Sequence, residues 1–288
     1  MKKILQIIVG LIIIILLLLG FLFYNEQDQN LTVVFFDVGQ GDAILIKTPT
    51  NQKILIDGGP DDKLITKLGR YFNFYDKKID LMILTHAHSD HLIGLIEVLK
   101  RYQVKQVLYN GVIDATPEFI NWLTIIKEQK IPLQIAVAGQ EYIFSDDLKL
   151  KILYPLENLT NQKFDDLNQT ALVSQLIYQK TNFIFMGDLP QEEEKEMLKN
   201  QINYQSDVIK IGHHGSKYST SEELLQAVKP TLAIIQVGKD NKFGHPDLVT
   251  LRRLQRKGIA ILRTDLNGDI IIESDGDKFY QKSPWFSN

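Results

Sequence analysis

The sequence predicts a layered α/β domain that follows one membrane-spanning helix. Short apolar runs typical of buried strands recur between residues 32 and 262, and amphipathic stretches with helical periodicity separate several of them. A long apolar run near the amino terminus has the length of a helix that crosses a bilayer. The remaining chain, about 255 residues, is enough for one large hydrophobic core.

The amino-terminal apolar run extends from Ile4 to Tyr24, and Gln6 is its only distinctly polar residue. About 20 such residues span a bilayer as a helix. Lys2 and Lys3 predict a cytoplasmic amino end, so the rest of the chain is expected outside the cell membrane. The main alternative is a cleaved signal peptide and a secreted protein. The apolar region of a signal peptide is shorter, about 7–15 residues, and ends in small residues, which this run lacks.

Each predicted element rests on its own apolar pattern. Strands are expected at residues 32–36, 43–47, 53–56, 81–84, 149–154, 171–177, 182–187, 207–211, 232–237 and 259–262. Helices are expected at residues 91–102, 117–129, 190–200, 221–229 and 247–257. The low-apolar stretch Glu157–Asn168 is expected to join two halves of one domain. That domain is expected to cover residues 31–288, after an anchor and linker over residues 1–30.

All six histidines fall in three short clusters. They are the closely spaced His86, His88 and His91, the adjacent pair His213 and His214, and His245 before a proline. Imidazole is the commonest metal ligand among side chains. The clustering therefore predicts a metal site, and a metal site in turn suggests hydrolytic chemistry.

The first cluster follows the apolar strand predicted at residues 81–84. In extended chain His86 and His88 project to the same side, and Asp90 and His91 lie where the next helix begins. One corner between strand and helix thus offers two ligand pairs. Two pairs suit two metals about 3.5–4 Å apart. The alternative is a polar loop that faces solvent.

Other nucleophiles are excluded by composition and motif. The chain has no cysteine, which rules out a cysteine nucleophile and lipoprotein attachment. It has no Gly-x-Ser-x-Gly elbow and no Walker or dinucleotide fingerprint. Water activated by a metal is therefore the expected nucleophile, since a metal lowers the pKa of bound water from about 15.7 toward 7.

The string Thr85-His86-Ala87-His88-Ser89-Asp90-His91, placed after an apolar strand, resembles the metallo-β-lactamase superfamily. Three further strings resemble the hydrolase domain of the competence permease family, which takes up DNA in bacteria: residues 36–46, 55–59 and 210–216. The resemblance covers roughly residues 31–284 and implies a four-layer αββα sandwich that acts as a hydrolase. The multi-span channel of these permeases has no counterpart here, so their transport function is not expected.

The resemblance also assigns the later ligands. Asp188, at the end of an apolar strand, is expected to bridge both metals; capping of the helix that begins near Pro190 is the alternative. His213 or His214 is expected to be the last ligand, with a slight preference for His213. Asp90, Asp188 and His245 are the predicted catalytic residues.

Outer positions follow from the same resemblance. Asp57 is expected to orient a metal-bound histidine, or else to serve as a turn aspartate before two glycines. Asp37, Gln40 and Asp42 lie in a Gly-rich corner that borders the site in the family, although a plain turn also explains them.

One departure from the superfamily pattern concerns the first metal. No histidine occurs between His91 and His213, and Asn168 occupies roughly the position of the missing ligand. His86, His88 and Asp188 would then be completed by water or Asn168. An oxygen-rich, open position weakens zinc retention and admits manganese, so one or two ions of Zn²⁺ or Mn²⁺ are expected.

The substrate-facing candidates are weaker. His245 is a candidate proton donor or phosphate contact, or else a turn residue held extended by Pro246. Lys210 and Ser216 are candidates for binding phosphate oxygens, and the alternative for Lys210 is a strand residue that faces solvent.

The expected function is a membrane-anchored phosphodiesterase or nuclease related to DNA uptake, and a separate channel protein is a candidate partner. Hydrolysis of phosphorylcholine-type or other esters is an alternative, and so is a non-catalytic module for DNA uptake or envelope assembly. The formal net charge is −3, yet residues 195–263 hold twelve basic against six acidic residues, 12 − 6 = +6. A positive rim would attract phosphodiesters, although a solvated helix face explains the Arg252–Lys257 group as well.

Overall fold

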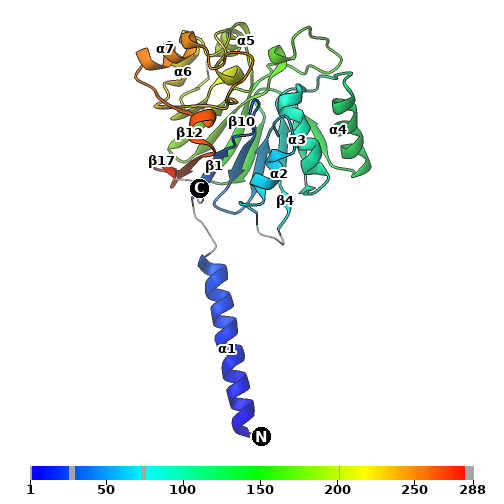
Figure 1. Cartoon of the computed structure of the whole chain (residues 1–288), viewed down its shortest axis with the longest axis vertical. Coiled ribbons are helices and arrows are strands. Elements are labelled where there is room, and N and C mark those ends of the chain that lie inside the picture. The colour runs from blue at the N-terminus through cyan, green and yellow to red at the C-terminus, as the bar shows by residue number, and fades with distance from the viewer. Residues whose placement is uncertain (1, 26–29, 73–75, 201, 283–288) are drawn as a thin grey trace.

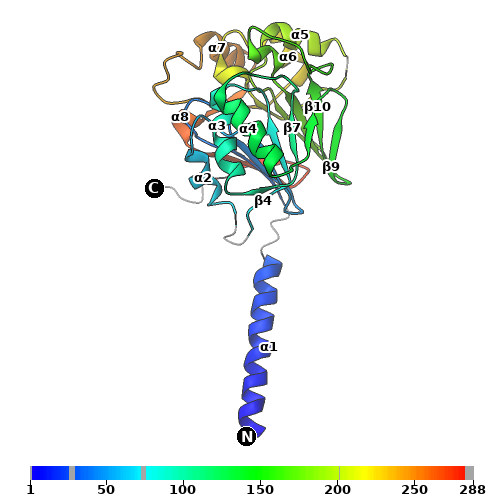
Figure 2. The same cartoon turned by 90° about the vertical axis from the view of Figure 1, so that its right-hand side faces the viewer.

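The structure is a computed structural model that describes residues 2–25, 30–72, 76–200 and 202–282. Two β-sheets lie face to face, and helices cover the outer side of each (Figures 1 and 2). The four-layer αββα sandwich is therefore confirmed. Helix α1 (Lys2–Asn25) projects away from these layers (Figure 1).

The first sheet has eight strands, and its antiparallel part joins the two ends of the folded region. In spatial order the strands are β17 (Phe279–Lys282), β16 (Ile270–Ser274), β1 (Leu31–Phe35), β2 (Ile44–Lys47), β3 (Lys53–Ile56), β5 (Leu81–Leu84), β7 (Val107–Tyr109) and β8 (Leu133–Ile135). Pairing is antiparallel from β17 to β3 and parallel from β3 to β8. A short parallel pair, β4 (Lys78–Ile79) and β6 (Gln103–Val104), lies apart from it.

The second sheet has seven strands and the same mixture of directions. Its order is β15 (Ala260–Arg263), β14 (Leu232–Ile235), β13 (Val208–Lys210), β12 (Thr181–Phe185), β11 (Val173–Tyr178), β10 (Leu148–Tyr154) and β9 (Glu141–Ser145). Pairing is parallel from β15 to β12 and antiparallel from β12 to β9.

Helices α2 (Lys63–Leu68), α3 (Ser89–Leu99) and α4 (Pro117–Glu128) pack on the first sheet. Helices α5 (Gln191–Leu198), α6 (Glu222–Val228) and α7 (Leu248–Arg256) pack on the second. The short helices η1 (Leu167–Thr170), η2 (Gly212–Gly215) and α8 (Thr264–Asn267) lie in connecting loops. Successive side chains of a strand point to opposite faces of its sheet, so one strand packs against the other sheet on one face and against helices on the other. Leu31, Val33 and Phe35 of β1 face the second sheet, and Val34 faces the helices.

The predicted helices and ten predicted strands match observed elements to within a few residues, but the predicted division into halves is wrong. Glu157–Asn168 connects β10 and β11, which are neighbours in the second sheet, rather than two halves. The chain passes between the sheets after β8 instead. Strand β16 was not predicted, although it pairs with β1 and completes the first sheet from the far end of the chain.

Helix α1 contains one segment long and apolar enough to cross a membrane, Lys2–Gly20, with a mean hydropathy of 2.8 and no part of it buried. Residues 26–29 of the predicted linker and residues 283–288 of the predicted hydrolase domain lie outside the described residues.

Candidate metal centre

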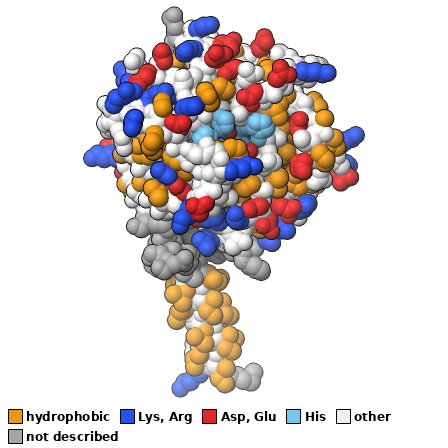
Figure 3. All heavy atoms as spheres, turned by 45° about the horizontal axis from the view of Figure 1, so that its top comes forward, with side chains coloured by type: hydrophobic (Ala, Val, Ile, Leu, Met, Phe, Trp, Pro, Cys, Tyr) orange, Lys and Arg blue, Asp and Glu red, His pale blue; other side chains and the backbone are white. Residues whose placement is uncertain are grey.

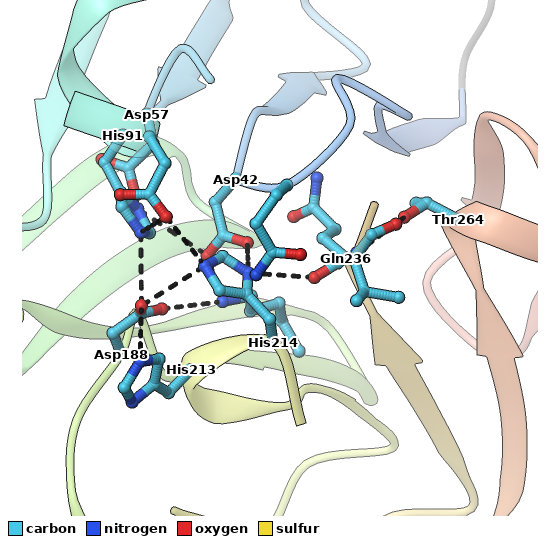
Figure 4. A network of polar contacts seen from close by, with 12 residues as sticks. Asp42, Asp57, His91, Asp188, His213, His214, Gln236 and Thr264 are labelled. Carbon is cyan, nitrogen blue, oxygen red and sulfur yellow. Dashed lines mark hydrogen bonds and ion pairs between the residues drawn. The ribbon is translucent and has the colours of Figure 1, made fainter. Parts of the chain in front are cut away.

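The histidine clusters and four aspartates meet where strands of both sheets end (Figure 4). Asp57 follows β3, and the loop after β5 carries His86 to His91. Across the sandwich, Asp188 follows β12, and η2 with His213 and His214 follows β13. Loops at the carboxyl ends of neighbouring parallel strands share one edge of a sheet, and ligand sites of α/β folds form there.

Two glycines, Gly58 and Gly94, let helix α3 approach this edge of the sheet closely. A Cβ on Gly94 of α3 would lie 1.8 Å from the carbonyl oxygen of Gly58, and one on Gly58 would lie 2.3 Å from the nitrogen of Leu95. The Gly58 N–H donates to the carbonyl of His91 at 2.7 Å. This contact brings the start of α3, with His91, against Asp57.

Asp57 holds His91 in the orientation of a metal ligand. Its Oδ2 lies 2.8 Å from His91 Nδ1, and Thr85 donates to the same carboxylate through its N–H at 2.8 Å and its hydroxyl at 2.7 Å. His91 Nε2 is buried, has no hydrogen-bond partner within the part of the chain that the structure describes, and lies 3.4 Å from Asp188 Oδ2. A carboxylate behind the ring fixes the tautomer that leaves Nε2 free for a metal.

His214, rather than His213, points into the donor cluster. Its Nδ1 donates to the carbonyl of Gln236 at 3.0 Å, and its Nε2 lies 3.2 Å from Asp90 Oδ2 and 3.4 Å from Asp188 Oδ2. The side chain of His213 is 30% exposed, and its Nε2 is 4.0 Å from Asp188 Oδ2. His213 thus lies at the solvent edge of the cluster, and we favour His214 as the ligand where the resemblance slightly favoured His213; the choice between them stays a prediction.

Both residues of this pair adopt left-handed backbone, with φ of 48° at His213 and 52° at His214. Such conformations are uncommon outside glycine and cluster at functional sites. Gly215 follows at φ 85°, where a Cβ would come within 2.6 Å of Pro246. The tight η2 turn thus points the two rings in different directions, one inward and one outward.

The first ligand pair also converges. His86 is fully buried, its Nδ1 lies 3.0 Å from Thr85 Oγ1, and its Nε2 lies 3.0 Å from His88 Nδ1. Donor atoms of His86, His91 and Asp188 lie within 4.8 Å of one another, and so do those of Asp90, His91 and His214. Imidazole and carboxylate donors in this mixture fit Zn²⁺ or Mn²⁺.

Asp188 does not cap the following helix. Helix α5 begins after Pro190 and has no side-chain cap, and Asp188 Oδ1 is buried without a hydrogen-bond partner among the described residues. Its other oxygen faces His91 and His214. This position between the two ligand groups is the one expected of a shared carboxylate.

Lys210 is completely buried, so the predicted alternative of a solvent-facing strand residue is wrong. Its ammonium forms an ion pair with Asp42 Oδ2, donates to the carbonyl of Gly187 at 3.0 Å and lies 3.6 Å from Asp188 Oδ1. Asp42 Oδ1 in turn lies 3.4 Å from His214 Nδ1. Lys210 therefore acts inside the cluster rather than at its surface.

The cluster carries more negative than positive permanent charge. With all four carboxylates ionised, Asp42, Asp57, Asp90 and Asp188 and the single ammonium of Lys210 sum to −4 + 1 = −3, and burial raises the pKa of Asp57 in this crowded site. Burial opposes protonation of His214, but Asp188 and Asp42 outweigh it and raise its pKa to about 10. Burial likewise opposes the charge on His91, and Asp188, Asp90 and Asp57 raise its pKa well above the usual value. In the metal-free chain the rings thus hold protons where two divalent cations would otherwise supply the positive charge.

The pKa of three other imidazole rings is lowered rather than raised, and burial is the main cause. It lowers the pKa of His86 well below the usual value, with neighbouring His91 acting in the same direction. It also lowers the pKa of His213 and of His245. These three imidazoles are therefore neutral at pH 7.

Asn168 lies buried in η1, and its Oδ1 has no hydrogen-bond partner among the described residues. Asn110, which sequence reasoning did not single out, ties this turn to the ligand loop. Its Nδ2 donates to the carbonyl of Thr85 at 3.2 Å and to the hydroxyl of Thr170 at 2.8 Å. An unpartnered amide oxygen at this turn remains a candidate oxygen donor.

The remaining predicted residues lie at the margin. Asp37 accepts from the N–H of Gly39 at 3.2 Å, as a turn residue does, and Gln40 accepts from the N–H of Gly238 at 3.1 Å. The Ser216 hydroxyl is buried and accepts from the N–H of Tyr218 at 3.3 Å. The ring of His245 lies 5.6 Å from that of His213, between the cluster and solvent.

Gln236 is a further buried residue of this centre that was not predicted from sequence. Fully buried, it accepts from His214 through its carbonyl and donates through Nε2 to the carbonyls of Phe36 at 3.0 Å and Ala43 at 2.9 Å. It thereby holds the loop that bears Asp42 against the second sheet. An isolated glutamine after an apolar strand carries no motif that could have revealed this role.

Residues 36–239 match the family model of the metallo-beta-lactamase superfamily. The chain belongs to this superfamily. Its fold agrees with that of the metallo-beta-lactamase fold protein YhfI from Bacillus subtilis, with a TM-score of 0.56 at 10% identity over 85% of this chain and 100% of that one. Divalent metal binding, which the superfamily fold implies, is consistent with the donor clusters.

The resemblance to competence proteins is also confirmed. ComE operon protein 3 of Bacillus subtilis (strain 168) is 33% identical over 256 residues, which are 83% of this chain and 32% of that protein. Competence protein ComA of Neisseria gonorrhoeae is 29% identical over 259 residues, which are 88% of this chain and 34% of that protein. The chain thus spans about a third of the length of the curated relatives it matches.

The Asp57–His91 contact leads to a prediction about metal affinity in this superfamily member. Asp57→Asn keeps the shape of the side chain but removes the charge behind His91, so the divalent-metal affinity should fall about 10–100-fold. Competition with a fluorescent chelator measures the change. The control Asp61→Asn alters an aspartate whose side chain is 40% exposed and should leave the affinity unchanged. Equal affinities for both variants would exclude the orienting role.

The protonated rings lead to a second prediction. A histidine must lose its extra proton to bind a metal, and His214, with its pKa raised from 6.5 to about 10, holds that proton at pH 8. Metal binding at pH 8 should therefore release about one proton or more per chain, and the release should decline as the pH passes 10. Calorimetry in two buffers of different ionisation enthalpy counts the protons. His214→Gln should lower the count, whereas His245→Gln should not, and an unchanged count in His214→Gln would refute the prediction.

Proposed function

We propose that this chain is a metal-dependent phosphodiesterase that acts on nucleic acid and takes part in DNA uptake or scavenging. The observation that carries the proposal is the pair of donor groups that share Asp188, with His91 held by Asp57 on one side and His214 held by Gln236 on the other. Such an arrangement suits in-line displacement at phosphorus, in which both the attacking and the leaving oxygen need stabilisation.

Each residue has a defined part in this proposal. His86, His88 and Asp188 would hold one metal, with Asn168 as a further oxygen donor, and Asp90, His91, His214 and Asp188 would hold the other. When bound, the metals activate water and neutralise phosphate charge. Lys210 and Asp42 keep Asp188 and His214 in place from behind.

His213 and His245 face the open side of the cluster, where a substrate would approach. Figure 3 shows histidine side chains visible from outside on this face, with charged and apolar side chains around them. Both rings are neutral at pH 7 because burial lowers their pKa. We assign His245, as a neutral imidazole, to donate a hydrogen bond to a phosphate oxygen; it holds no extra proton at pH 7 to deliver to the leaving oxygen.

The substrate class is inferred from the relatives, which are competence proteins. The basic residues at the end of α7 offer less positive charge to a phosphodiester than the composition predicts. Arg256 lies 2.8 Å and Lys257 3.2 Å from Glu222 of α6, which offsets their charge. Esters of phosphorylcholine type are the second candidate within the same chemistry. A non-catalytic module is disfavoured, because His86, Asp90 and His91 of the first cluster bring donor atoms together with those of Asp188 and His214.

The apolar segment of α1 is proposed as an uncleaved membrane anchor with its amino end in the cytoplasm. The hydrolase domain, residues 31–288, would then lie outside the membrane. A separate channel protein is a proposed partner in this setting, since the relatives are competence proteins.

Hydrolysis by the full-length chain in detergent micelles tests the proposal. The chain is loaded with Mn²⁺ or Zn²⁺ and given bis-p-nitrophenyl phosphate, single- and double-stranded DNA, and p-nitrophenyl phosphorylcholine. A His88→Ala/Asp90→Ala double variant serves as the control. Metal-dependent cleavage of DNA that the control lacks is the expected result. Cleavage of the phosphorylcholine ester alone would move the substrate to the second candidate, and no cleavage with either metal would reject the proposal.

A further inference from the structure

An exposed aromatic ring lies at the open side of the metal centre. The side chain of Phe243 is 58% exposed, and its ring stacks on that of His245 with centroids 6.0 Å apart and planes inclined by 19°. His245 in turn lies 5.6 Å from His213, whose Nε2 is 4.0 Å from Asp188. Three rings thus lead from the donor cluster to the surface.

The loop that carries this ring is held firmly. The amide of Asn241 donates to the carbonyls of Gly238 at 2.9 Å and His245 at 2.7 Å, and it accepts from the N–H groups of Phe243 at 3.2 Å and His245 at 3.0 Å. One side chain therefore closes the loop on both sides of Phe243. A rigid, solvent-facing aromatic ring offers contact area at a low entropic cost.

A cation lies beside the same ring. Lys242 Nζ is 5.4 Å from the centroid of Phe243. Because an ammonium already faces this ring, a second cation such as a quaternary ammonium is disfavoured by like-charge repulsion. A neutral planar group joined to a phosphate is favoured, since the ring can stack on the planar group and Lys242 can attract the phosphate.

We propose that Phe243, supported by His245 and flanked by Lys242, is a stacking site for one nucleobase next to the phosphate at the metal centre. This inference rests on the proposed phosphodiesterase function and names the part of a nucleic acid that the site selects. Stacking on an aromatic ring is tolerant of base identity because every base has a π-face. The site therefore selects strands that carry accessible bases, without reading their sequence.

Binding of short single strands to the full-length chain tests the stacking site. A fluorescein-labelled oligothymidylate with phosphorothioate linkages, which resist cleavage, is compared with the same backbone lacking all bases, in Mn²⁺ and detergent micelles. Fluorescence anisotropy gives the two dissociation constants. The wild-type chain should prefer the base-bearing strand by at least about 5-fold.

Three variants separate stacking from other effects. Phe243→Ala should reduce the preference to near unity, and Phe243→Tyr should restore it because the ring returns. Tyr218→Ala is the matched control: Tyr218 is 67% exposed and has Lys217 Nζ 5.1 Å from its ring centroid. This variant should keep the preference, because no ring contact joins Tyr218 to the histidines among the described residues.

Each remaining outcome has a fixed meaning. Equal binding of both strands by the wild-type chain, binding of neither, or an unchanged preference in Phe243→Ala would overturn the stacking site. Competition by free choline would overturn the choice of a neutral planar group. A preference that depends on Phe243 without cleavage of any phosphodiester strand would keep the stacking site and reject the phosphodiesterase.

Discussion

Replacing Asp188 by asparagine should lower the metal content from about two ions per chain to one or none, and hydrolysis should fall by more than about 100-fold. The bound is set by the 10–100-fold loss expected when only an outer partner of a ligand is removed. Asp188 Oδ2 lies 3.4 Å from both His91 Nε2 and His214 Nε2, so its charge serves both donor groups. Elemental analysis after gel filtration, with diester hydrolysis on the same sample, measures both quantities.

The matched control for this prediction is Asp277→Asn, because Asp277 has a side chain that is 57% exposed and pairs only with the exposed Lys180 among the described ion pairs. It should retain both metals and full hydrolysis. The melting temperature of the metal-free Asp188→Asn chain shows whether it remains folded. A folded Asp188→Asn chain that still binds two metals would exclude the shared-carboxylate role.

Replacing Lys210 by methionine should destabilise the metal-free chain by about 3–5 kcal/mol, because it removes the ammonium that pairs with the buried Asp42 and leaves the cluster with a larger excess of negative charge. For a domain of this size that corresponds to a fall in melting temperature of roughly 6–20 °C. Methionine preserves the length and apolar stem of the lysine, so the loss reports the charge. Thermal unfolding followed by circular dichroism in excess chelator gives the value.

Two further variants make this measurement specific. Lys180→Met removes an exposed lysine from an ion pair with Asp277 and should not shift the melting temperature measurably. The double variant Lys210→Met/Asp42→Asn should be more stable than Lys210→Met alone, because the unpaired charge is gone. If Lys210→Met and Lys180→Met had the same melting temperature, the buried ion pair of Lys210 and Asp42 would have no structural role.

The positions of both ligand pairs in the first histidine cluster could be predicted from sequence because their geometry is local. A strand followed by closely spaced histidines and a helix start places His86, His88, Asp90 and His91 on one corner with no long-range information. The place of Asp188 beside them was predicted from the family resemblance, since its position after an apolar strand alone also suits a helix cap. Sites at strand ends are read more reliably than sites that depend on packing between distant loops.

Lys210 and the histidine pair required the packed structure. All three residues of β13 are buried, because a central parallel strand is covered on both faces, so alternation gives no sign of which way Lys210 points. The choice between His213 and His214 depends on two consecutive left-handed residues and on Gln236, which lies on a different strand connection. Neither feature leaves a local pattern.

The same limit explains the missed parts of the fold. Strands β1 and β16 are neighbours in the first sheet but lie at opposite ends of the domain's sequence. The place of β16 therefore depends on contacts that no short window of sequence contains. The polarity of the irregular stretch after β10 predicts a connection between two halves of the domain. The stretch instead returns the chain to β11, the neighbouring strand of the same sheet. Polarity marks a loop but does not say which elements the loop connects.

A metal titration of DNA cleavage by the metal-free, full-length chain tests the central claim most directly. Cleavage of single-stranded DNA should be absent in chelator, should rise with added Mn²⁺ and should level off near two equivalents per chain. Asp188→Asn should stay inactive across the titration. Cleavage that persists in chelator, or a chain that binds two equivalents and cleaves nothing, would contradict the assignment of this centre as a metal-dependent phosphodiesterase.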